Sequence, residues 1–344
     1  MAEEGHTRGQ FLGAGAALSA GALASTWRSP EAAEAQEAAP TPLAASEGVV
    51  TEGAFGPDFD GEKFFLELDG EPGGFVVDVQ GGFPHGEILE TPNGPDQFKK
   101  HIGNVKYEEV SFKFAMTQQP QGLFNWISET LDRSVPSRSG SIKACDADFR
   151  VTQQGHFTDA LITEIGFPAL DAAAKDPAYM TLKFSSDAIA TEGGGGTVPS
   201  GGVKAGDASF KFAAGSLSSK APAKIDAFTI KQGLAEVSPG GPKRAAKISI
   251  PDIKVTLTRN SGLSSWLAFY EDFLVEGNHS EADEIDGQVT LTNSKGTKEL
   301  ATIDLLNMGI LAAIPVTEQV DGETVRRVQV EMYCEELHFD IASS

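Results

Sequence analysis

Alternating apolar and polar positions predict strands along this chain, and the predicted strands come in two similar sets. A period of two residues is typical of a strand with one buried face. Residues 110–114 show it in Val110, Phe112 and Phe114, and residues 253–257 repeat it. Further alternating or apolar segments predict more strands, at residues 142–151, 160–170, 180–184, 288–293, 301–314 and 328–332. The chain is therefore expected to be rich in β-structure.

Two short stretches instead have helical periodicity, and each follows one of the alternating segments. Residues 122–131 and 262–271 both contain Leu, two residues and then Trp, as Leu123 with Trp126 and Leu263 with Trp266. Large aromatic side chains dominate small cores, so we expect these four residues to anchor each helix in a core.

The second helix is predicted in more detail. Leu263, Trp266, Leu267, Tyr270 and Leu274 recur at the spacing of one helical face. That face is expected to be buried. Ser261 would cap its N-terminus and Gly277 its C-terminus.

The order strands, helix, strands thus occurs twice, which predicts two tandem domains. We place them at residues 61–190 and 207–344. Between them, residues 191–206 hold four consecutive glycines and further Gly and Pro, which is typical of a linker. Residues 1–60 are expected to form a signal-like segment and a flexible linker.

The N-terminal segment partly matches a twin-arginine export signal. Thr7, Arg8, Phe11 and Leu12 fit the pattern, but Gly9 stands where the second arginine belongs. The following apolar run is too short to predict a membrane span. A plain flexible tail is the alternative, so the location stays open between a cytoplasmically assembled particle and export to the cell exterior.

Three stretches of the first predicted domain resemble a known family. They are Phe64–Gly70, which ends in an Asp-Gly turn, Gly103–Tyr107, and the Leu-x-x-Trp helix at Leu123–Trp126. This ordered set resembles the tail tube proteins of contractile phages and of phage-like injection systems. The resemblance covers residues 64–189 well. It covers residues 208–341 less well, because Lys247–Pro251 stands in place of the second stretch.

The resemblance implies a mainly β fold of two antiparallel barrel or sandwich domains, each with one packed helix. It also implies a structural role, in which homo-oligomeric rings stack into a hollow tube with sheath or baseplate proteins as further partners. Three chains would make a pseudo-hexamer, and six chains are the alternative. Two other functions stay open: an exported surface filament, and a secreted β-sandwich module that binds a ligand or hydrolyses a substrate.

The segment from Gly81 to Ile102 resembles the loop that reaches the next ring in such tubes. It has no clear periodicity, and a long loop of this kind is usually functional or disordered. We expect it to order on assembly, with a merely flexible loop as the alternative. Its candidate ring-stacking residues are Phe83, Pro84, Ile88, Leu89, Phe98, Lys99 and Lys100.

Charge and the reactive residues point away from nucleic-acid binding and from catalysis. The formal net charge of −22 repels nucleic acid, and no basic run offsets it. An acidic wall would instead let an anionic cargo pass without sticking. Cys145 and Cys334 are the only cysteines, too few for a Cys-rich zinc site. Neither zinc-ligand spacing nor a nucleophile motif is present, so we expect no cofactor, no metal and no enzyme activity.

Overall fold

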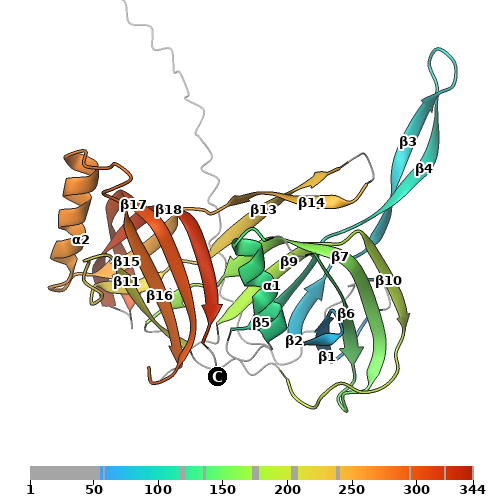
Figure 1. Cartoon of the computed structure of the whole chain (residues 1–344), viewed down its shortest axis with the longest axis horizontal. Helices are drawn as coiled ribbons and strands as arrows, with labels where there is room; N and C mark the ends of the chain where they lie inside the picture. Colours follow the sequence, from blue (N-terminus) through green and yellow to red (C-terminus); the bar gives the residue numbers. More distant parts are fainter. Residues whose placement is uncertain are drawn as a thin grey trace, which may run out of the picture. The chain divides into compact units, whose positions relative to one another are not determined.

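A computed structural model shows a chain built mainly of antiparallel strands (Figure 1). It describes residues 55–56, 59–116, 121–134, 137–172, 178–202, 208–237, 241–293, 296–320 and 323–342. The predicted export signal lies outside these residues. The predicted mainly β fold is confirmed.

Six strands of the N-terminal half close into a barrel. They are β1 (Lys63–Leu68), β2 (Glu71–Gln80), β5 (Val110–Ala115), β6 (Arg138–Cys145), β7 (Val151–Phe167) and β9 (Tyr179–Ser185). Their order is β7-β6-β1-β2-β5-β9, and β9 pairs back with β7. Closure leaves the barrel strands with partners on both sides, which removes open edges.

The first hairpin of the barrel turns at Asp69 and Gly70. Both have positive φ, 51° and 84°, as the two-residue type I′ turn requires. Asp-Gly is a favoured pair for that turn because Asp tolerates the left-handed region and Gly has no Cβ. The predicted Asp-Gly turn therefore sets the pairing of β1 with β2.

One helix, α1 (Gln121–Leu131), packs into the core of this half. Leu123, Trp126 and Ile127 are fully buried. Trp126 lies 5.8 Å from Phe184 between ring centroids, and Phe184 lies 4.7 Å from Phe157 on β7. Aromatic contacts at these distances favour tilted arrangements and add to the burial of apolar area.

The C-terminal half forms a seven-stranded sheet in the order β11-β16-β17-β18-β15-β12-β8. Its strands are β11 (Ala208–Ala214), β12 (Pro222–Ile225), β15 (Ile253–Thr258), β16 (Ile285–Asn293), β17 (Glu299–Val320), β18 (Glu323–Ile341) and the short β8 (Leu170–Asp171). Strand β8 comes from the N-terminal half, where it follows β7. Its pairing with β12 joins the two halves.

The second helix differs from its prediction. Helix α2 (Leu263–Tyr270) continues as a π-helical turn, η1 (Glu271–Val275). Gly262 occupies the N-cap position and has no side-chain cap, so the prediction of Ser261 as the cap is wrong. Leu263 and Trp266 are buried, but Leu267 and Leu274 are each 40% exposed. The helical face predicted to be buried is thus covered only in part.

The predicted linker begins as regular structure. Strand β10 (Ala188–Gly193) pairs with β7, and the amide of Gly194 then donates to the carbonyl of Thr152. Residues 47–344 form one compact unit, so the division into two domains stays a prediction. No helix in the described part of the chain is long and apolar enough to cross a membrane.

Candidate functional site

The segment predicted as a loop at 81–102 is a β-hairpin. Strands β3 (Pro84–Pro92) and β4 (Phe98–Tyr107) form a separate two-stranded sheet, seen as the pale-blue ribbon in Figure 1. The expectation of a segment without regular structure is therefore wrong. Every residue of β3 is exposed, so the hairpin exists without a covering layer.

Cross-strand pairs explain why these residues form a hairpin. Glu90 lies opposite Lys100, and their charged groups are 3.1 Å apart. At the tip, the Asn93 amide donates to the Gln97 carbonyl at 2.7 Å. Opposite charges in directly facing positions each stabilise a pair of strands by a few tenths of a kcal/mol, up to about 1 kcal/mol.

The hairpin has one apolar face, which we call the hairpin face: Ile88, Phe98, Ile102 and Val105. Ile88 lies directly opposite Ile102, and Val105 lies opposite Gly86. The exposed fractions are 61% for Ile88, 62% for Phe98 and 79% for Ile102. Side chains of this size are seldom left in water as a group unless they meet a partner.

The predicted ring-stacking residues divide between several positions. Phe83 precedes β3 and is half-buried, and its carbonyl accepts the Glu108 amide. Lys99 and Leu89 lie on the face opposite the hairpin face. Pro84 begins β3. Ile88 and Phe98 belong to the hairpin face, and Lys100 lies on the same side of the hairpin.

Ile102 and Val105 were missed as members of this surface. A bulge hides them from a period-two search, because Glu87 on β3 faces two residues, Gly103 and Asn104, on β4. The extra residue puts Ile102 and Val105 on one face although they are an odd number of positions apart. A search that allows one extra residue in β4 would have found both side chains.

A second hairpin has the same bulge but a different environment. Strands β13 (Phe228–Glu236) and β14 (Lys243–Ser249) pair with one residue, Gly233, facing two. This hairpin lies against the barrel, since β13 pairs with β7 from Phe228↔Phe167 to Lys231↔Glu164. The inner face of this second hairpin is therefore covered by the barrel, whereas the hairpin face of β3–β4 is exposed.

Polar contacts hold the second hairpin in place. The Gln232 amide nitrogen donates to the Ile162 carbonyl at 2.7 Å. The Lys243 ammonium donates to the Ser185 hydroxyl at 2.6 Å and to the Ser186 carbonyl at 3.1 Å. The two hairpins also meet, because Lys106 lies 3.8 Å from Glu236.

Helix α1 is covered on its outer side by the end of β18. Phe124 and Phe339 have ring centroids 5.6 Å apart, and the Ser128 hydroxyl donates to the Phe339 carbonyl. Farther along, Asp132 and His338 are 2.6 Å apart. The two halves of the chain therefore share a packed contact between α1 and β18.

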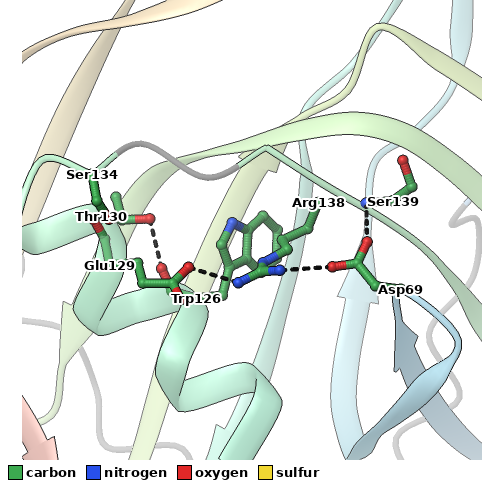
Figure 2. Close-up of polar contacts among 7 residues, drawn as sticks. All are labelled: Asp69, Trp126, Glu129, Thr130, Ser134, Arg138 and Ser139. Carbon is green, nitrogen blue, oxygen red and sulfur yellow. Dashed lines mark hydrogen bonds and ion pairs between the residues drawn. The ribbon is translucent and has the colours of Figure 1, made fainter.

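A charge cluster fixes α1 to the barrel (Figure 2). Arg138 on β6 donates to Asp69 at 2.9 Å and to Glu129 at 2.6 Å. The Ser139 amide also donates to Asp69, at 3.1 Å. Burial lowers the pKa of Arg138, but the hydrogen bond with Asp69 and the charge of Glu129 outweigh it and raise that pKa. The guanidinium thus joins the helix to the β1–β2 turn.

We expect Arg138→Ala to lower the free energy of unfolding by about 1–2 kcal/mol, because two carboxylates lose a shared partner. Urea unfolding followed by circular dichroism measures this loss. Arg150→Ala is the matched control, since its pair with Asp148 spans 3.6 Å and both side chains are well exposed. The control should change stability by less than about 0.5 kcal/mol. Equal losses in the two variants would contradict this role of Arg138.

The residues with reactive side chains do not converge. Cys145 and Cys334 are buried and free. Burial raises the pKa of Cys334 to about 11, which keeps its thiol protonated and unreactive at neutral pH. No group of three or more His, Cys, Asp or Glu side chains that could hold a metal ion occurs within the described ranges. Glu284 instead accepts the Tyr333 hydroxyl at 2.6 Å.

Comparisons with known proteins match only part of the chain. No family model matches, and no curated protein matches. A chain of the sheath/tube terminator of an extracellular contractile injection system, PVC, aligns with 38% of this chain and 93% of its own, at 18% identity and a TM-score of 0.33.

Two further solved structures give similar values. A chain of the PVC sheath–tube complex covers 38% of this chain and 88% of its own, at 18% identity and a TM-score of 0.32. A chain of the anti-feeding prophage baseplate covers 38% and 91%, at 11% identity and a TM-score of 0.31. The first two of these structures belong to an extracellular contractile injection system and the third to the anti-feeding prophage.

Proposed function

We propose that this protein is a structural subunit that associates with copies of itself into rings, and that the rings stack into a hollow tube. The observation that carries the proposal is the uncovered hairpin face. A two-stranded hairpin is at best marginally stable alone in water. One that also exposes Ile88, Phe98 and Ile102 gains most from a partner that covers them.

The charge distribution supports self-association at this hairpin. The whole chain carries a formal charge of −22, so two copies repel each other on average. Residues 84–107 are formally neutral, because their acidic side chains match their lysines in number: Glu87, Glu90 and Asp96 against Lys99, Lys100 and Lys106. The hairpin is thus a place where two acidic chains can approach at low electrostatic cost.

The strand order supports a repeated unit as the building block. The barrel runs β7-β6-β1-β2-β5-β9 and the second sheet runs β17-β16-β11, then β12-β15-β18 back to β17. Each strand of the barrel has a counterpart in this order, although β11 and β12 are not paired with each other as β1 and β2 are. The resemblance of residues 64–189 to tail tube proteins supports a tube, in which three chains would form a sixfold-like ring and an acidic lumen would let anionic cargo slide.

Electron microscopy of the purified chain tests the proposal. At rising protein concentration we expect rings or tubes, and added salt should promote them because it screens repulsion between acidic chains. Sedimentation velocity on the same samples gives the number of chains in each particle. A particle that stays monomeric at high concentration and in high salt would refute the proposed function.

A further inference from the structure

We propose that the hairpin face of one chain docks on a second copy of this chain, on the uncovered surface that α2 and β17 form. We call this surface the acceptor face: Leu267 and Leu311. The inference rests on the proposed function and names the two surfaces that meet. Within the chain, the β13–β14 hairpin docks on β7 and α1. The corresponding β3–β4 hairpin has no such contact within the described residues, and neither has the corresponding surface of β17 and α2.

The contact made within the chain is the β13–β14 hairpin on β7 and α1. Ile230 and Gln232 on β13 are buried, and Ile248 on β14 is half-buried. Together they line a small cavity with Leu131 of α1 and Ile165 of β7. The hairpin therefore covers both a strand and the helix that packs beside it.

The hairpins correspond residue by residue because they share a bulge. Gln232 pairs with Ile248 just before the bulge in one, and Gly86 pairs with Val105 just before it in the other. Val105 on the hairpin face is thus the counterpart of Ile248. The face that is covered in the second hairpin is the face that is exposed in the first.

The receiving strands correspond in the same way. Strand β7 bulges at Thr163, between Ile162 and Glu164, and β17 bulges at Leu311, between Ile310 and Ala312. Beyond the bulge, β7 pairs with β9 on one side and with β13 on the other. Beyond its own bulge, β17 pairs only with β18 among the described residues. One edge of β17 thus lacks the hairpin that β7 has.

The exposure of equivalent side chains shows what the missing hairpin would cover. Thr163 is 5% exposed, whereas its counterpart Leu311 is 41% exposed. Ile127 of α1 is fully buried, whereas Leu267, at the same place after the helix tryptophan, is 40% exposed. Leu311 and Leu267 are therefore exposed at positions whose counterparts in the first half of the chain are buried.

The exposed large hydrophobic side chains concentrate on the elements that carry these two surfaces. Of the large ones that the described part of the chain exposes, all but Val237 belong to the β3–β4 hairpin or to α2, η1 and β17. The hairpin and the acceptor are different surfaces, so the contact is head-to-tail. Such a contact repeats from chain to chain and closes a ring when the rotation permits. Pro315 carries no N–H, so added strand pairing would end at Ile314.

Two single variants and their mixture test this contact. Ile102→Asp removes the hairpin face and leaves the acceptor, and Leu311→Asp does the reverse. Both side chains are exposed, so the fold should survive, as circular dichroism and melting curves can verify. Each variant alone should associate about tenfold or more weakly than the unchanged protein. Mixed in equal amounts, the two should form dimers that grow no further, because one intact contact remains.

Matched controls and opposite outcomes complete the test. Thr91→Asp on the other face of the hairpin and Thr317→Asp on β17 add the same charge outside the contact, and both should assemble normally. Mass photometry counts the chains per particle. Normal assembly of Leu311→Asp, or a mixture that stays monomeric, would overturn the docking surface alone. An unchanged protein that never assembles would overturn the proposed function itself.

Discussion

Replacing Gly81 by alanine is expected to lower the free energy of unfolding by about 4 kcal/mol or more, which is a large fraction of the stability of a typical protein. Gly81 has a φ of +84°, and a Cβ at this position would lie 1.9 Å from the Glu109 carbonyl oxygen. That oxygen belongs to the backbone, so the chain itself must move. Urea unfolding followed by tryptophan fluorescence measures the loss.

Gly70→Ala is the matched control for Gly81. Its φ is also +84°, but nothing lies within 4 Å of the added Cβ. The conformational cost alone is about 1–2 kcal/mol for an L-residue in this region. The difference between the two variants therefore isolates the collision with Glu109. Similar losses of stability in the two variants would contradict the prediction, because they would show that the backbone at Glu109 moves away at little cost.

Trp126→Ala and Trp266→Ala are each expected to cost about 3–5 kcal/mol, because each removes a fully buried large side chain from a core. Both variants should unfold in one thermal transition, at a lower temperature than the unchanged protein. The reason is that β13 pairs with β7 and β8 pairs with β12, so the two halves share hydrogen-bonded strands. Differential scanning calorimetry of the two variants checks this.

The calorimetric result also decides how the two predicted domains behave. Two separate transitions, with Trp126→Ala lowering one and Trp266→Ala the other, would mean independent folding units. The Leu267→Ala variant is the control within the same helix. Its side chain is 40% exposed, so its loss should be well below that of Trp266→Ala in either case.

Local pattern was enough to predict strands that have one buried face. Val110, Phe112 and Phe114 in β5 are all buried, in step with their alternation. The Asp-Gly turn and the short helices were equally visible, because each depends on residues close in sequence. The mainly β fold follows from signals of this kind.

Contacts between distant segments were not predictable in the same way. The periodicity of α2 placed Leu267 on the apolar face, but periodicity does not say whether anything covers that face. The pairing of β13 with β7 is likewise invisible, since it depends on how one half of the chain meets the other. Of the hairpin face, Ile88 and Phe98 were named from the sequence, but Ile102 and Val105 were missed because the bulge and the Glu90–Lys100 pair interrupt the apolar pattern.

The docking of β13–β14 on β7 has a consequence for the thermodynamics of association. Because both partners belong to one polypeptide, this contact forms at a fixed effective concentration, whatever the amount of protein in solution. In a closed ring, every second contact between units would then be formed before any two chains meet. Only the remaining contacts would cost translational and rotational entropy. If the proposed rings form, the joining of two such units in one chain would therefore lower the protein concentration at which they begin to form.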